Sequence, residues 1–150
     1  MSWRVASVAL IALLATGCAP NPRNEIAAIA EAALTAAPRV GPGQPLCVER
    51  TIAPWLPAEE ERRVDAPAPP GFETLRTAGR FRGGGGLKGV RVGRVMVQSG
   101  PTCIDLRGPV VGGDRAMIEL HLAGAGTNSW LQRTGGRWHV VAVTTSRYAE

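Results

Sequence analysis

The sequence predicts a small α+β domain in which one amphipathic helix packs on an antiparallel sheet. Two observations predict this class. A single stretch near the start has apolar residues at helical spacing, and from residue 72 onward short segments of alternating character follow one another with Gly-rich turns between them. A helix followed by a meander of strands is typical of α+β domains. The chain has 150 residues, 45% of them hydrophobic, which is enough for one domain with its own core.

The first 17 residues have the three parts of a secretory signal. Arg4 gives the start a positive charge, residues 5–15 form an apolar core, and Thr16 and Gly17 are the small residues of a cleavage region. The apolar core is shorter than the ~20 residues that span a membrane, and the prolines that follow it stop a helix. We therefore expect residues 1–17 to be a cleaved signal peptide rather than a transmembrane span.

The end of this signal has a specific resemblance. "LATGC" (14–18) resembles the bacterial lipobox, in which small residues precede an obligatory cysteine, although Ala15 stands where the family usually has leucine. The resemblance implies cleavage before Cys18, which would be diacylated on sulfur and acylated on nitrogen, with residues 18–23 as a short lipidated tether. Several acyl chains anchor a protein stably. The alternative is ordinary signal cleavage, which leaves Cys18 as a free thiol.

The chain has three cysteines, Cys18, Cys47 and Cys103. An odd number leaves one thiol unpaired in an oxidising compartment, so a lipid on Cys18 would leave Cys47 and Cys103 to form a disulfide. That bond would close a loop of about 55 residues and contribute roughly 4 kcal/mol. The alternative is that both are small buried hydrophobes. Because the sequence has no CxxC and no histidine near either cysteine, we expect no metal site. We also expect no cofactor.

The helix is expected over residues 22–37. Asn21 can cap it, Pro22 suits its first position, Glu25 lies in its first turn, and Pro38 ends it. Its apolar residues recur three and four positions apart and form one stripe that should pack on the sheet: Ile26, Ile29, Ala30, Ala33, Leu34 and Ala37.

The remainder is expected to complete a single domain over residues 24–150. Residues 45–52 are predicted as its first strand. Residues 53–71 contain five prolines and are predicted to be an irregular excursion. The three adjacent carboxylates of residues 59–61 are expected to be a solvated charge run, because acid–base chemistry needs a desolvated site that separates two pKa values.

Two surface patterns precede and interrupt the strands. "GGGLKG" (84–89) matches GxGxxG, but a strand pattern rather than a helix follows it, so we interpret it as a hairpin tip and not a nucleotide site. Residues 76–94 carry six basic side chains around this hairpin. They could contact anionic headgroups, or they could be a solvated hairpin.

The C-terminal pattern carries a second resemblance. "GPVVGGDRAMIEL" and the strands after it resemble a hairpin of small proteobacterial lipoproteins of unknown function, and "GGRWHVV" (135–141) is similar to the last strands of the nuclear-transport-factor-like cone fold. The resemblance implies a curved sheet beside the helix and brings no catalytic residue to this chain. Trp130 and Trp138 are expected to be core anchors rather than ligand stackers.

Two functional classes follow. We favour a lipid-anchored cell-envelope protein with a structural or binding role and no catalytic residue. Its expected partner is the membrane, through the lipid on Cys18, with an anionic envelope surface as a further possibility. By the sorting rule of such lipoproteins, Ala19 after the cysteine implies the outer membrane, facing the periplasm. The net charge of +5 does not indicate nucleic acid, because export removes that partner.

The alternative is a small enzyme or ligand-binding protein that uses a cone-shaped pocket. Asp105, Glu119 and His121 would be the residues to examine, and their convergence in a closed apolar pocket would favour this class. The sequence offers no nucleophile in a recognisable context, so we expect Glu119 and His121 to be solvent-facing strand residues. No ligand or oligomeric state follows from the residues.

Overall fold

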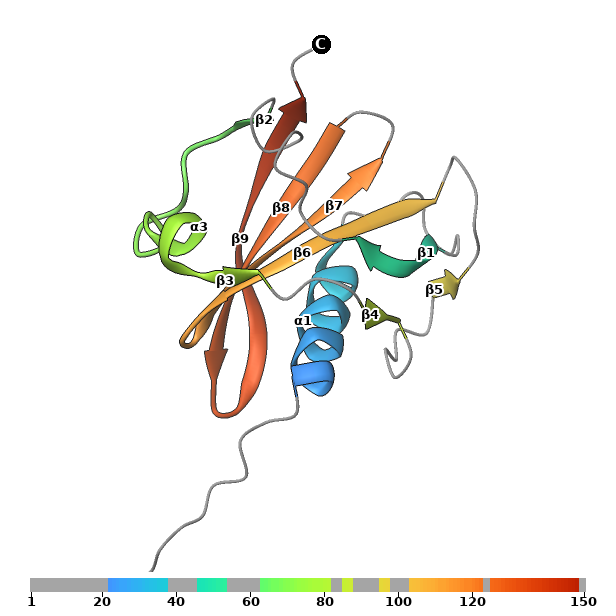
Figure 1. Cartoon of the computed structure of the whole chain (residues 1–150), viewed down its shortest axis with the longest axis horizontal. Coiled ribbons are helices and arrows are strands. Elements are labelled where there is room, and N and C mark those ends of the chain that lie inside the picture. The colour runs from blue at the N-terminus through green and yellow to red at the C-terminus, as the bar shows by residue number, and fades with distance from the viewer. Residues whose placement is uncertain are drawn as a thin grey trace, which may run out of the picture.

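The structure of the protein is a computed structural model, and most of the residues that it describes are in β-strands. The predicted signal, Cys18 and the tether up to residue 21 lie outside the described residues. The described residues form one mixed sheet with a helix, in agreement with the predicted α+β class (Figure 1). They are residues 22–37, 46–53, 63–81, 85–87, 95–97, 103–122 and 125–148.

Helix α1 spans Pro22–Ala36, which agrees with the range predicted from its apolar stripe. The stripe is buried, with Ile29, Ala33 and Leu34 among its fully buried members. Glu25 in the first turn accepts a hydrogen bond from Arg133 at 3.3 Å and so ties the start of the helix to the sheet.

The four strands closest to the C-terminus form an antiparallel meander. They lie in the order β9-β8-β7-β6, and β1 lies beyond β6. The turn between β8 and β9 consists of Gly135 and Gly136, whose φ angles of 58° and 77° suit the tight turns that join hairpin strands. The strands and the short helix are β1 (Leu46–Ala53), β2 (Arg63–Asp65), α3 (Leu75–Ala78), β3 (Arg80–Phe81), β4 (Gly85–Gly86), β5 (Val95–Val97), β6 (Ile104–Gly112), β7 (Arg115–Leu122), β8 (Ala125–Thr134) and β9 (Arg137–Tyr148).

The prediction of a purely antiparallel sheet is wrong at β1. This strand pairs in parallel with β6, with Val48 opposite Ile104, and in parallel with β5, with Cys47 opposite Met96. Parallel neighbours need a long connection that returns the chain to the same end of the sheet. The chain between β1 and β6 is such a connection, and nothing in the pattern of β1 itself indicates the direction of its partner.

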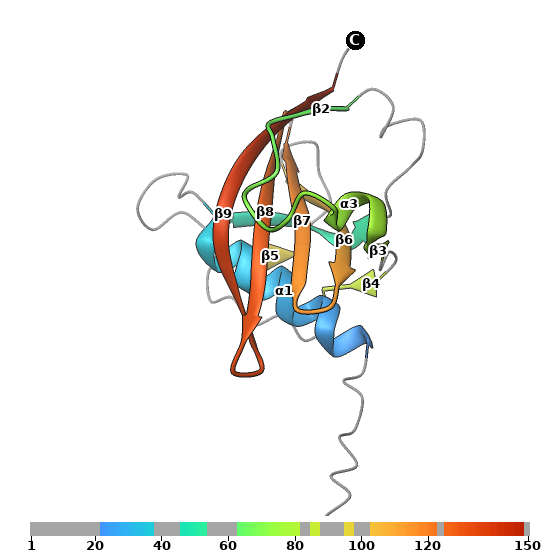
Figure 2. The same cartoon turned by 90° about the vertical axis from the view of Figure 1, so that its left-hand side faces the viewer.

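The two faces of the sheet are covered by different parts of the chain (Figure 2). On one face, α1 packs against residues that include Ile118 and Leu131. On the other face, Phe72 and Leu75 pack against strand residues that include Trp130. The sheet is therefore buried on both faces over part of its area.

Residues 53–71, predicted as an irregular excursion, contain a short strand that the prolines did not indicate. Residues 63–65 form β2, which pairs with the end of β9, and the segment that follows leads to Phe72 on the face opposite α1. Residues 66–69 have no regular structure, as expected. Residues 54–62, with the acidic run, lie outside the described part of the chain.

Both predicted aromatic anchors are buried. Trp130 is 1% exposed, donates a hydrogen bond from Nε1 to Thr144 Oγ1 at 2.8 Å, and meets Phe72 edge to face with the ring centroids 5.6 Å apart. Trp138 lies in the core under α1. The prediction that both tryptophans are core residues is confirmed.

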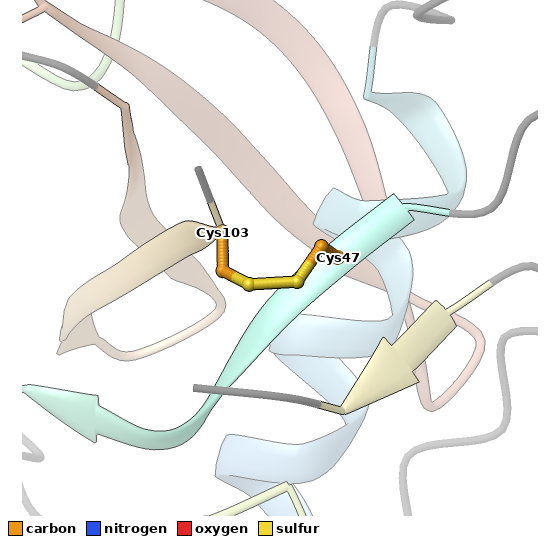
Figure 3. The surroundings of a disulfide bond; sticks show 2 residues. All are labelled: Cys47 and Cys103. Atoms are coloured by element: carbon orange, nitrogen blue, oxygen red, sulfur yellow. A yellow bond between two sulfur atoms is a disulfide. The ribbon is translucent and has the colours of Figure 1, made fainter. Parts of the chain in front are cut away.

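Cys47 and Cys103 form a disulfide, with their Cα atoms 4.6 Å apart (Figure 3). Cys47 lies near the start of β1, and Cys103 comes directly before β6. The predicted pairing is confirmed, and it joins the two parallel strands at the end where both begin. Among the described residues, no helix is long and apolar enough to cross a membrane.

Candidate functional site

Polar side chains gather on the sheet face opposite α1. In β7, the alternate residues Ala116, Ile118 and Leu120 are buried on the α1 side. The two-residue period of a strand therefore directs Glu119 and His121 to the opposite face. The strand register then pairs residues on this face, with Asp105 opposite His121 and Arg107 opposite Glu119. The three residues named from the sequence, Asp105, Glu119 and His121, do share one face.

Strands β8 and β9 add three more residues to this face. Asn128 lies opposite Glu119, Gly126 lies opposite His121, and Ser146 lies opposite Gly126. The Ser146 hydroxyl donates a hydrogen bond of 2.5 Å to Oε1 of Glu119. This bond reaches from β9 to β7 across β8, and it passes over Gly126. We call Asp105, Arg107, Glu119, His121, Asn128 and Ser146 the polar cluster.

Gly126 is what allows this contact. A Cβ atom at this position would overlap both the Glu119 carboxylate and the Ser146 hydroxyl. A glycine inside a strand often marks a close approach of other groups to the backbone. The sequence analysis named Asp105, Glu119 and His121 but missed Gly126, a glycine inside a strand that is a further signal for this site, whereas Asn128 and Ser146 carry no recognisable pattern.

The polar cluster has a buried end and a rim. Glu119 and Asn128 are fully buried, and Ser146 is 1% exposed. At the rim, Arg107 Nε donates to Asp105 Oδ2 at 3.1 Å, and the side chains are 13% and 29% exposed. The expectation of a solvent-facing Glu119 is therefore wrong, because neighbouring strands place polar groups over it. A buried carboxylate is costly unless hydrogen bonds and charges compensate it, and Ser146 supplies one such bond.

The chemistry open to the polar cluster is limited by its burial. A serine hydroxyl bonded to a carboxylate can lose its proton to it, which is one requirement of nucleophilic catalysis. A substrate must also reach the hydroxyl, and Ser146 is buried. Two cavities that are lined by described residues lie elsewhere. Among the residues that the structure describes, no three His, Cys, Asp or Glu side chains are grouped as metal ligands.

The larger of these cavities is a groove between α1 and β9. It has a volume of about 510 Å³, within the range of pockets that bind small molecules or side chains. Ala28, Ala32 and Ala36 of α1 line one side, and Trp138 and Val140 of β9 line the other. The second cavity, of about 210 Å³, lies beside α3. Neither of these two cavities is lined by a residue of the polar cluster.

Two predicted sites cannot be placed. Cys18 lies outside the described residues. The basic hairpin of residues 76–94 is described only in part, and of its six basic side chains only Arg76, which is half-buried on α3, has a described position. The interpretation of "GGGLKG" as a hairpin tip is wrong for its described part, because Gly85 and Gly86 form β4, which pairs with Thr51 and Ile52 of β1.

Comparisons with protein-family models, with curated proteins and with solved structures found no match. The class of protein is therefore defined by its own features. It is a small, disulfide-bonded domain with a mixed sheet that is covered on both faces.

Proposed function

We propose that the protein is a lipid-anchored cell-envelope protein, in the outer membrane and facing the periplasm, whose domain has a structural or binding role. Its mature chain begins at Cys18, which carries the lipid. The helix and the curved antiparallel meander beside it form the folded part. The single observation that carries this proposal is the Cys47–Cys103 disulfide, because disulfides persist in oxidising compartments and this one leaves Cys18 as the one remaining cysteine.

The length of the tether fixes how the domain would meet the membrane. Helix α1 begins at Pro22, so the chain from Cys18 can span at most ~14 Å when fully extended. The first turn of α1 must then lie near the lipid surface. Arg133 bonds both Glu25 in this turn and Asp114 in the β6–β7 turn, at 3.3 Å and 2.8 Å. The β6–β7 turn would therefore face the membrane together with the start of α1.

Binding rather than catalysis is the role we propose for the domain, since the polar cluster is buried and the cavities lie away from it. A small enzyme is the second candidate. The observation that favours it is the hydrogen bond from Ser146 to the buried Glu119 at 2.5 Å. A Ser146→Ala variant that folds like the parent but loses an activity of the protein would favour this candidate. A variant that loses only stability would show that Ser146 and Glu119 have a structural role in the core.

The anchor is tested by labelling bacterial cells that express the full chain with radioactive palmitate. We expect the protein to take up the label and to fractionate with the outer membrane, and mass spectrometry of the mature N-terminal peptide should find an acylated Cys18. Cys18→Ser should abolish the label. The matched control, Cys47→Ser with Cys103→Ser, should keep it.

The sorting of the protein is tested separately. Ala19→Asp should move the labelled protein from the outer to the inner membrane without loss of the lipid. An unlabelled parent protein in the soluble periplasmic fraction, with a free thiol at Cys18, would contradict the whole proposal.

A further inference from the structure

We propose that the outer edge of β9 binds an extended, acidic peptide segment of a partner protein, which joins the sheet as an additional strand. The choice of a protein partner rests on the binding role proposed above, but the lipid anchor is not required. Addition of a strand to an open sheet edge is a common mode of peptide recognition, in which backbone hydrogen bonds provide affinity and alternate side chains provide specificity.

Among the strands that the structure describes, the outer edge of β9 is unpaired over most of its length. On that side, the described strands include only β2, which pairs with residues 146–148 (Figure 2). Ala66 adds one further bond, from its N–H to the Thr145 carbonyl at 3.1 Å. Residues two apart in a strand point their backbone groups to the same side, so Val143 also directs its N–H and carbonyl outward. The edge from residue 137 to Val143 has no partner among the described strands.

This edge also carries exposed apolar side chains. Val141 and Val143 are 54% and 50% exposed, and they are the large hydrophobic residues found exposed in the described part of the chain. Natural sheets normally protect their edges with charges, prolines or bulges. The pairing register between β8 and β9 shifts by one residue, because Trp130 lies opposite Ala142 and Leu131 lies opposite Val140, with Val141 between them. Val143 and Thr145 lie beyond this irregularity, in register with β8.

The groove between α1 and β9 lies beside this edge. Trp138 and Val140 form its β9 wall, and the small side chains of Ala28, Ala32 and Ala36 leave room on the α1 side. A strand that pairs with β9 would direct every second side chain to the face on which α1 lies. The groove, of about 510 Å³, can receive apolar side chains of that strand.

Charge selects the partner. β9 contains Arg137, His139 and Arg147, all exposed, and no aspartate or glutamate. Glu31 of α1 lies at the groove itself, so acidic residues of a partner are expected at the ends of its strand rather than within the groove. Two copies paired over the open residues 137–143 would set Arg137 of one opposite the apolar Val143 of the other, because β2 already pairs with residues 146–148, whereas an acidic side chain of a peptide would face Arg137 as an opposite charge. An acidic peptide therefore fits this edge better than a second copy of the chain.

The probe is a fluorescent octapeptide of alternating valine and threonine with two acidic residues at its ends, titrated into the full-length protein. We expect it to bind more tightly than the same peptide with lysines at its ends, and a peptide with proline at a central position should not bind. In the parent protein, bound peptide should slow amide hydrogen exchange within residues 137–143. Absence of binding, equal binding of the proline peptide, or unchanged exchange would each overturn the proposal.

Variants of the edge make the test specific. Val143→Pro removes an N–H that points away from β8, so the sheet can keep its bonds while the peptide should bind about tenfold more weakly. Val143→Thr is the matched control and should bind like the parent. Arg137→Glu should reverse the preference between the acidic and lysine peptides. If the parent protein instead forms a dimer that Val143→Pro dissociates, the occupant is a second copy and the proposal is wrong.

Discussion

Replacement of Cys47 and Cys103 together by alanine should lower the free energy of unfolding by about 4 kcal/mol. The two residues are 56 positions apart in the sequence, and their disulfide closes that loop in the unfolded chain. Loop closure on this scale removes about 14 cal/mol/K of entropy from the unfolded state, which gives the figure above at room temperature. Alanine is preferred to serine because Cys103 is only 7% exposed, and a buried hydroxyl would add a penalty of its own.

Urea unfolding followed by circular dichroism measures this loss. With a urea dependence of ~2 kcal/mol per molar, the midpoint should fall by about 2 M. The parent protein in the presence of a reductant should unfold like the double variant, which separates the effect of the cross-link from that of the lost side-chain volume. Cys18→Ala should unfold like the parent.

Two results would refute the reasoning. Equal midpoints for the parent and the double variant would mean that pairing of β1 with β6 suffices without the bond. A parent protein that reductant does not destabilise, beside a variant that is less stable, would assign the loss to packing around Cys103 rather than to the cross-link.

Two further substitutions test the two faces of the sheet. Leu34→Ala should lower the free energy of unfolding by about 2–5 kcal/mol in urea titrations, because Leu34 is fully buried on the face of α1 that packs against the sheet, while the exposed Thr35→Ala should change it by less than ~0.5 kcal/mol. Gly126→Ala should cost about 1–3 kcal/mol, because its Cβ would overlap the Glu119 carboxylate and the Ser146 hydroxyl. The exposed Ala125→Ser is its control, and equal thermal midpoints for these two variants would contradict the described path of the Ser146 bond.

Helix α1 could be predicted from the sequence because all of its signals are local. An apolar stripe at helical spacing, with Pro22 at its first position and Pro38 after it, needs no knowledge of distant residues. The meander of β6 to β9 was equally accessible, since glycine-rich turns separate segments with a two-residue alternation. The expectation of strand from residue 72 onward is wrong at Leu75–Ala78, which form the short helix α3. The disulfide followed from counting the cysteines of a chain whose first residues are predicted to be an export signal.

The parallel placement of β1 and the burial of Glu119 could not be predicted, because neither has a local signal in the sequence. A strand pattern carries no direction, so only the long chain between β1 and β6 hints at a parallel pair. Glu119 looks like the polar half of an alternating strand, and its burial depends on Ser146 two strands away and on a missing side chain at Gly126. Both features are set by segments that are distant in sequence.

The order of the elements along the chain has a consequence for how the protein folds as it is synthesised. Helix α1 packs against β6, β7, β8 and β9, and β1 pairs with β6. Helix α1 and strand β1 are therefore synthesised before the strands against which they pack or with which they pair. A chain that emerges from a translocation channel N-terminus first would present the apolar stripe of α1 and the thiol of Cys47 to the surrounding medium until Cys103 and the meander arrive. Loss of β9 through a late stop codon would remove Trp138 and Val140 from the core on which α1 packs, rather than trimming one edge of a finished domain.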